Sequence, residues 1–325
     1  MMAWQIPEKE GVSLQAFSIA FQAIVPLFLI IAVGYAVKRL GWIGPEDVRK
    51  FNKVTFYTFM PVMLFYNIYT SDFSQAVRLP YVLFVVGAAL GMILLAFVIT
   101  ILVEKMPERR GVMIQAAFRS NFVLLGLPIA MELLPEGNFG VTALMIAIVV
   151  PIFNMMSVVV LEYFRGEKPK IGEVLLAVAK NPLIIGSAVG LLMQALHITL
   201  PAVLVSFAGK MNSAATPLIL LLLGASFEAR DMARYKKDLF VCVGLRLVVF
   251  PGIILALAAA IGLRGIEFVT LLAMTAAPTA VNSFNMAQQL GGDSQLAGSA
   301  VVVSTAASFF TLFIWVTLFK QLGMF

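Results

Sequence analysis

Charged and reactive side chains are scarce in this sequence. Of its 325 residues only 12% are charged, whereas 61% are hydrophobic, and the mean hydropathy is +0.97. There is one cysteine, Cys242, and one histidine, His197. A single cysteine excludes a disulfide framework and a cysteine-based metal centre. So few charges exclude an ordinary soluble protein, and the composition is typical of a polytopic membrane protein.

Catalytic signatures are also missing. The sequence has no His, Cys and Asp spacing that suits a metal ion, no nucleophile elbow, no phosphate-binding loop and no pair of intramembrane aspartates. The first residues, MMAWQIPEKEGVSLQ, include acidic side chains and no basic stretch, so we expect no cleaved signal peptide. We therefore expect a protein that is not an enzyme and that has no resident cofactor.

The chain consists instead of long apolar stretches. A helix of about twenty apolar residues crosses a bilayer, and ten such stretches can be read, at 17–38, 51–69, 80–103, 111–132, 139–162, 173–196, 203–227, 239–262, 266–290 and 295–319. Runs such as LFVVGAALGMILLAFVITILV (83–103) are apolar on every face, which excludes the alternation of a β-barrel. The sequence predicts an all-α bundle of ten transmembrane helices.

The distribution of lysine and arginine predicts the orientation. Sixteen of these residues fall in one alternating set of loops and only four in the other, and the basic set is expected in the cytoplasm. Both termini are therefore predicted to lie outside, with the protein in the cell membrane. The net charge of +6 is explained by this asymmetry and by attraction to anionic lipid, so we expect no nucleic-acid partner.

The two halves of the chain resemble each other at an offset of 156 residues. Ten of the thirty-nine positions from 26 to 64 are identical at this offset, and three prolines recur. Two inverted five-helix repeats are therefore predicted, at 17–163 and 173–325, with an outer segment 1–16 and a linker 164–172. The alternative to a repeat is that the match arises by chance between apolar helices of similar composition. The recurring prolines are Pro26, Pro45 and Pro61, matched by Pro182, Pro201 and Pro217.

Two equivalent segments break the usual rules for membrane helices. Inverted-repeat transporters place polar groups and backbone at helix breaks that line a cavity, so we expect the substrate site here. The alternative is that proline is simply common in membrane helices, and that Asn and Ser join neighbouring helices. The fourth segment contains Arg119, Ser120, Asn121, Gly126 and Pro128, and the ninth contains Pro278, Asn282, Ser283 and Asn285.

Two arginines are expected deep in the membrane. Arg119 and Arg246 each lie nine residues beyond the last loop cation, or about 14 Å at ~1.5 Å per helical residue. Every Asp and Glu falls in a loop or at a segment end, so no carboxylate is expected to pair with them. The arrangement favours an anionic substrate, because guanidinium binds carboxylate well. The alternative is that each arginine binds carbonyls freed by nearby prolines. Lys210 is expected at the outer interface.

The same lack of deep carboxylates bears on energy coupling. Proton relays and many sodium sites use intramembrane Asp or Glu, so coupling through a protonated side chain is disfavoured. Sodium held by carbonyl, amide and hydroxyl oxygens is an open alternative, and so is uniport.

Four motifs stand in order over nearly the whole chain. They are FNKVTFYTFMPVMLF (51–65), KNPLIIGSAVGLL (180–192), RLVVFPGIILALAAAIGLRG (246–265) and APTAVNSFNMAQQLGGDSQLAGSAVVVST (277–305). In this order they resemble the auxin efflux carrier family, which includes plant PIN-FORMED carriers and bacterial permeases linked to malate and malonate. The resemblance implies two inverted five-helix repeats, helices four and nine broken where they cross, and scaffold and transport subdomains that move against each other.

The resemblance also implies roles in the fourth helix. The plant carriers read Pro-Asn-Thr-Leu-Val-Met-Gly-Ile-Pro here, and their asparagine contacts the substrate carboxylate. Asn121 matches that asparagine, Gly126 the glycine and Pro128 the second proline. Ser120 stands where the first proline would be, and Arg119 has no basic equivalent in the plant motif. The arginine suggests a substrate more anionic than the plant hormone.

In the ninth helix, Pro278 matches the family's crossover proline, and Val281 a position whose neighbouring backbone helps to hold the substrate. Asn282 replaces a second proline of the plant proteins. The sequence therefore predicts a carrier of a small organic anion such as malate, malonate or an auxin-like acid. Asn121 would donate to the carboxylate, and Arg119, with Arg246, would supply positive charge. The alternatives are a non-transporting ligand sensor and a sodium-coupled symporter. Pro278, Asn282 and Asn285 would shape the opposite wall, and a homodimer in the bilayer is an open possibility.

Overall fold

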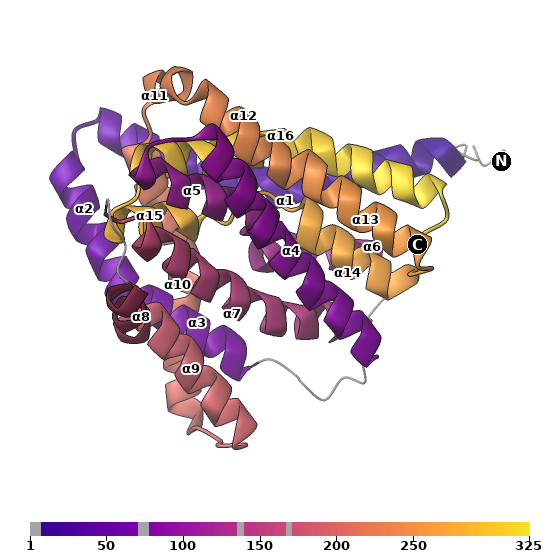
Figure 1. Cartoon of the computed structure of the whole chain (residues 1–325), viewed down its shortest axis with the longest axis horizontal. Helices are drawn as coiled ribbons and strands as arrows, with labels where there is room; N and C mark the ends of the chain where they lie inside the picture. Colours follow the sequence, from indigo (N-terminus) through magenta and orange to yellow (C-terminus); the bar gives the residue numbers. More distant parts are fainter. Residues whose placement is uncertain (1–7, 71–77, 135–139, 167–170) are drawn as a thin grey trace, which may run out of the picture.

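The computed structural model describes residues 8–70, 78–134, 140–166 and 171–325, which form a bundle of helices (Figure 1). Within these residues there is no β-strand, and the one β-type pairing is an isolated antiparallel bridge between Ser120 and Thr279. The predicted all-α class is confirmed. Residues 1–7 of the predicted outer segment and residues 167–170 of the predicted linker lie outside the described part.

Each predicted apolar stretch contains one helix or one interrupted helix. The first half contains α1 (Glu8–Arg39), α2 (Pro45–Val54), the π-helical turn η1 (Thr55–Phe59), α3 (Met60–Tyr69), α4 (Leu79–Val103), α5 (Pro107–Phe118), η2 (Phe122–Gly126), α6 (Leu127–Leu133) and α7 (Gly140–Tyr163). The second half contains α8 (Ile171–Lys180), α9 (Pro182–Ala195), α10 (Ala202–Ser226), α11 (Ala229–Arg234), α12 (Lys236–Gly244), η3 (Leu245–Val249), α13 (Phe250–Ala260), α14 (Gly265–Ala276), α15 (Asn282–Gln289) and α16 (Ser294–Gln321).

Five helical segments of the described chain are long and apolar enough to cross a membrane, judged by length and composition. A sixth candidate joins Gly172–Lys180 to Pro182–Ala195 with a bend of 62°. Proline disfavours the helical conformation of the residue before it, and the Asn181 side chain caps α9 by accepting from the Leu183 N–H at 2.9 Å. The apolar pattern alone does not reveal this bend. The five are Leu79–Val103, Gly140–Tyr163, Ala202–Ser226, Lys236–Ala260 and Ser294–Gln321.

Three π-helical turns stand directly before proline-containing turns. η1 precedes Pro61, η2 precedes Pro128 and η3 precedes Pro251. A proline ring crowds the carbonyl four residues earlier and cannot donate to it. The wider π-helical turn lets the next N–H reach five residues back, as Met60 does to Thr55, so the helix continues past the proline.

The helices pack in two groups. α1 lies along α10, and α3 lies along α9. The other group contains α4 to α7 with α12 to α16: α4 packs on α5 and α7, and these two pack on α12, α14 and α16. α1 also packs along α16 and so joins the two groups. In Figure 1, α9 lies at the bottom of the view and α13 and α14 at the right. Small residues let membrane helices approach closely. A Cβ on Gly34 or Gly224 would lie 2.0 Å from a carbonyl oxygen of the facing helix. The corresponding distances to carbonyl oxygens of α3 are 2.5 Å for Gly186 and 3.0 Å for Gly190.

Candidate functional site

Two helix breaks meet inside the second group. α5 ends at Phe118 and α14 at Ala276, and both chains then run extended before helical structure resumes. Here the two segments pair through the antiparallel bridge between Ser120 and Thr279. The Asn121 N–H donates to the Pro278 carbonyl at 2.8 Å, and the Ala280 N–H donates to the Arg119 carbonyl at 3.1 Å.

Local chemistry explains the break at Pro278 and the close approach of the two segments. Pro278 disfavours a helical conformation at Ala277, whose ψ of 146° is extended. Thr279 anchors the extended chain, since its Oγ1 donates to the Ala116 carbonyl at 2.8 Å and its N–H donates to Ser304 Oγ at 3.2 Å. On the other chain, Gly126 lets η2 touch α14, because a Cβ there would lie 2.7 Å from a carbonyl oxygen of α14.

Arg246 braces the crossing from behind. Its guanidinium is fully buried, and it donates to carbonyls at the C-terminal ends of both α5 and α14. These carbonyls lack hydrogen-bond partners within their helices, and the C-terminal ends of the helices carry partial negative charge. One guanidinium supplies both the missing donors and the opposite charge. The acceptors are the carbonyls of Phe118 (2.9 Å), Met274 (2.8 Å), Thr275 (2.5 Å) and Ala277 (2.9 Å).

Arg246 therefore follows the second of the two readings offered by the sequence. It binds carbonyls at the helix breaks, and it is not among the residues that line the cavity described next. We correct its expected contact with substrate to a structural role. The carbonyls come from the broken helices α5 and α14, not from the neighbourhood of Pro251.

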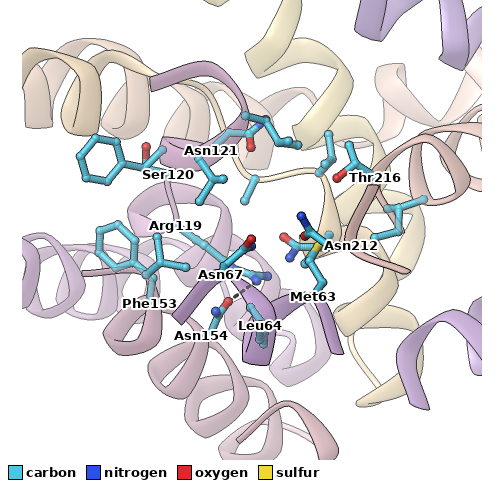
Figure 2. A pocket seen from close by; sticks show the side chains of 18 of the residues that line it. Met63, Leu64, Asn67, Arg119, Ser120, Asn121, Phe153, Asn154, Asn212 and Thr216 are labelled. Carbon is cyan, nitrogen blue, oxygen red and sulfur yellow. Dashed lines mark hydrogen bonds between the residues drawn. The ribbon is translucent and has the colours of Figure 1, made fainter. Parts of the chain in front are cut away.

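A cavity of about 230 Å³ lies in front of the crossing (Figure 2). One wall comes from the crossing itself and from α7. The other comes from α3 and α10, so the cavity separates the two helix groups. Its polar lining consists of Asn67, Arg119, Ser120, Asn121, Asn154, Asn212, Ser213, Thr216 and Asn282.

Arg119 is the charged residue of this lining. Its side chain is buried, with 2% of the residue exposed, and it has no ion pair with any carboxylate of the described chain. Its Nη2 donates to Asn154 Oδ1 at 2.5 Å, and its Nη1 lies 3.5 Å from Ser283 Oγ and against the sulfur of Met286. A buried cation held only by neutral groups favours a negative ligand.

Three further polar atoms around the cavity have no hydrogen-bond partner within the described residues. They are Ser120 Oγ, Asn121 Nδ2 and Asn154 Nδ2. The three residues are 2–5% exposed, and all of them line the cavity. Leaving a buried polar atom unpaired costs about 1–3 kcal/mol, so these groups are poised to bind a ligand.

The residues predicted in the ninth segment separate into two sets. Val281 and Asn282 line the cavity. Pro278 pairs with Asn121 behind it, and Asn285 points elsewhere, since its Nδ2 donates to Asn52 Oδ1 at 2.7 Å. Asn285 is therefore not part of the expected cavity wall.

Several polar lining residues escaped the sequence analysis. Asn67 lies on α3, Asn154 on α7, and Asn212 and Thr216 on α10. Their helices run without a break, so the search for broken helices does not find them, although Thr216 directly precedes Pro217 and Asn154 lies three residues after Pro151. An isolated asparagine in a predicted span is the available signal, and it is weak because such residues also join helices.

Comparison with known proteins now decides the family. The profile of the family described as "Membrane transport protein", the auxin efflux carrier family, matches residues 19–316. The chain belongs to this family.

Relatives of this membrane transport protein carry transporter names. An "Uncharacterized transporter" of Methanocaldococcus jannaschii is 24% identical over 311 residues, covering 91% of this chain and 98% of that protein. A second "Uncharacterized transporter", from Methanothermobacter thermautotrophicus, is 24% identical over 309 residues, covering 90% of this chain and 96% of that protein. A "Putative malonate transporter" of Rhizobium meliloti is 23% identical over 296 residues, covering 89% of this chain and 92% of that protein. The relatives indicate a multi-pass membrane transporter rather than an enzyme.

A second, open hollow adjoins the cavity. It shares Asn212 and Ser213 with the cavity lining, and Tyr66 and Lys210 also line it. Lys210 is exposed. A cation at the mouth of a polar path raises the local concentration of anions.

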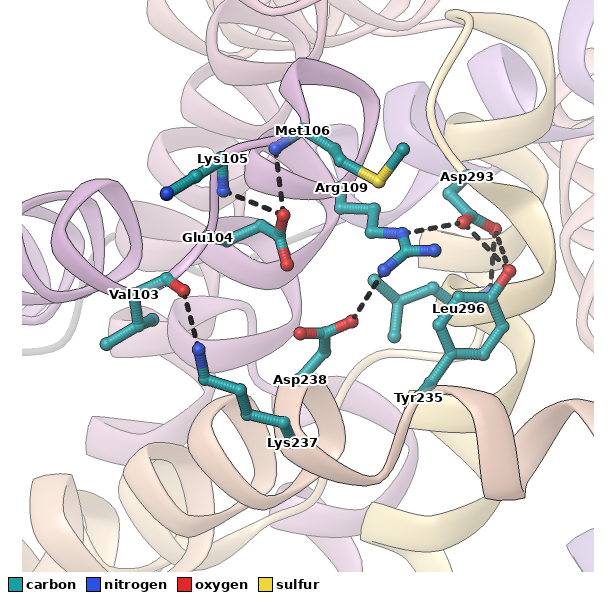
Figure 3. Close-up of polar contacts among 10 residues, drawn as sticks. All are labelled: Val103, Glu104, Lys105, Met106, Arg109, Tyr235, Lys237, Asp238, Asp293 and Leu296. Carbon is teal, nitrogen blue, oxygen red and sulfur yellow. Dashed lines mark hydrogen bonds and ion pairs between the residues drawn. The ribbon is translucent and has the colours of Figure 1, made fainter.

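An ionic cluster ties together one end of the second helix group (Figure 3). Arg109 at the start of α5 lies 3.4 Å from Asp238 of α12 and 3.5 Å from Asp293, which caps α16. The Tyr235 hydroxyl donates to Asp293 at 2.8 Å. Burial and this hydrogen bond raise the pKa of Tyr235 to about 12, so it remains a donor at neutral pH. The cluster makes these three helix ends one unit.

Proposed function

We propose that this protein is a secondary transporter that carries a small organic anion by alternating access. One observation carries the proposal. The cavity at the helix crossing contains a buried arginine without a carboxylate partner in the described chain, next to three unpartnered polar groups. A carboxylate supplies both the missing charge and the missing acceptors.

In this proposal Arg119 provides the counter-charge, and Ser120, Asn121 and Asn154 donate to the carboxylate. Val281 and Asn282 contribute the neighbouring wall. The N-terminal ends of the helical segments that begin at Phe122 and Asn282 add partial positive charge. The volume of about 230 Å³ is below the ~300–1,000 Å³ typical of drug-sized ligands, which favours a small acid. The name of the Rhizobium relative points to the same size range.

We further propose ten spans in two inverted repeats, with both termini outside the cytoplasm in the cell membrane. Two glycines support the repeat. Gly34 and Gly190 are 156 residues apart, which is the sequence offset, and each packs on a helix of the other half. The cavity lies between the two helix groups, so movement of one group against the other would open it to each side in turn.

Energy coupling follows from the lining. No carboxylate of the described chain lines the cavity, so a proton-carrying side chain is not proposed there. Uniport is the simplest coupling, and sodium bound by neutral oxygens is the alternative. Uptake that ignores imposed pH and sodium gradients would support uniport.

The test uses purified protein in liposomes and labelled malate, malonate or indole acetate. We expect exchange of at least one acid, and an Arg119→Gln variant should lose at least tenfold in kcat/KM. Arg264→Gln is the control with the same change of side chain, because Arg264 is exposed and does not line the cavity.

Lack of flux for all three acids, together with unchanged uptake of another solute in Arg119→Gln, would refute the anion proposal. Thermal stabilisation by an acid without any flux would point to a sensor instead.

A further inference from the structure

The two walls of the cavity differ in charge. The crossing and α7 provide Arg119 with the donors of Ser120, Asn121 and Asn154. The wall from α3 and α10 provides only neutral polar groups, from Asn67, Asn212, Ser213 and Thr216. In Figure 2, Arg119 and Asn154 lie on one side and Asn212 and Thr216 on the other. The described lining thus offers one full positive charge and a second, uncharged polar patch.

We propose that the site selects a monoanion, with one carboxylate at Arg119 and a neutral polar group facing Asn212 and Thr216. The neutral group can be a hydroxyl, an amide or a protonated carboxyl, since amide and hydroxyl side chains both donate and accept hydrogen bonds. A dicarboxylic acid would then be bound as its singly charged form. This inference rests on the proposed function and specifies its substrate class.

Helix ends do not change this charge balance. The C-terminal ends of α5 and α14 are occupied by Arg246. The N-terminal ends at Phe122 and Asn282 each favour an anion by roughly two- to fivefold. Burying a second carboxylate without a cation costs several orders of magnitude in affinity. The cost of the second charge is therefore larger than the gain from the helix ends.

The test compares acids of nearly equal shape and different charge. Malonate is paired with its monoamide, malonamate, and succinate with succinamate. Binding to the purified transporter is followed by thermal stabilisation and by inhibition of exchange in liposomes. At pH 7.5 we expect each monoamide to bind at least tenfold more tightly than its diacid. Lowering the pH by one unit should strengthen diacid binding about tenfold and leave monoamide binding unchanged, because only the diacid gains singly charged molecules.

A charge-gain variant provides an independent measurement. Asn212→Lys adds a cation to the neutral wall and should shift preference toward the diacid by at least tenfold. Ala202→Lys is the matched control, because Ala202 lies on the same helix, is exposed and lines neither the cavity nor the adjoining hollow. It should leave the preference unchanged.

Tighter, pH-independent binding of the diacids in the unmodified protein would overturn the monoanion inference while leaving organic anion transport intact. An unchanged preference in a folded Asn212→Lys protein would overturn it too. If no diacid or monoamide binds or exchanges in any variant, the proposed function itself fails, which is a separate outcome.

Discussion

Replacing Arg246 by methionine should destabilise the protein without altering the cavity lining. The guanidinium satisfies four backbone carbonyls at the ends of two broken helices, and methionine keeps the length of the side chain but none of its donors. Each unsatisfied buried carbonyl costs about 1–3 kcal/mol. Partial relaxation of the carbonyls brings the total to about 3–5 kcal/mol, near the lower end of the ~4–12 kcal/mol expected for four fully unpaired groups. At about 2–4 °C per kcal/mol this lowers the Tm by roughly 6–20 °C.

The assay is thermal unfolding of purified protein, followed by tryptophan fluorescence. The Tm of Arg246→Lys should lie between those of the original protein and Arg246→Met, since the lysine ammonium has three donors for four carbonyls. Arg264→Met serves as the control, because Arg264 binds backbone carbonyls at an exposed site. Folded Arg246→Lys should bind the anion within about threefold of the original protein. The reasoning is refuted if Arg246→Met melts within about 2 °C of the original protein, or if Arg246→Lys loses binding while its Tm is unchanged.

Three other outcomes are expected. Asn154→Asp should abolish anion uptake with an unchanged or higher Tm, because the new carboxylate neutralises Arg119 in place of substrate; retained uptake in vesicles would contradict this. Gly34→Leu should prevent stable packing of α1 on α10, measured as loss of folded protein in detergent, whereas Gly87→Ala, which meets open space, should be tolerated. Lys210→Gln should lower kcat/KM about threefold at low salt and little at high salt; a salt-independent loss would argue against steering.

The sequence predicted the helical class and the two breaks for clear physical reasons. Long apolar stretches have few stable conformations in a bilayer other than the helix. Proline in the middle of such a stretch disrupts the helix, and the break in the ninth segment lies at Pro278. In the fourth segment the break at 119–121 precedes Gly126 and Pro128, and the chain continues through these two residues as η2 and α6, so they do not make the break. The bend at Asn181 and the three π-helical turns were not predicted, because they depend on how local strain at a proline is relieved.

The candidate site was predicted only in part. Arg119, Ser120 and Asn121 were found because they stand beside helix breakers. Asn154 and Asn212 were not, because a lone asparagine reads the same whether it joins helices or lines a cavity. Asn285 was placed in the cavity by its position in the chain, but its helical turn directs it toward Asn52.

Arg119 and Arg246 show most clearly the division between sequence and tertiary structure. By itself the sequence determined that two arginines lie deep in apolar segments without nearby carboxylates, because charge and hydropathy are local properties. Only the tertiary structure decided that Arg246 donates its hydrogen bonds to the carbonyls of two crossing helices, whereas Arg119 faces a cavity. The physical reason is that the partners of a buried charge come from helices distant in sequence, and only packing determines whether those partners are backbone carbonyls or a space for a ligand.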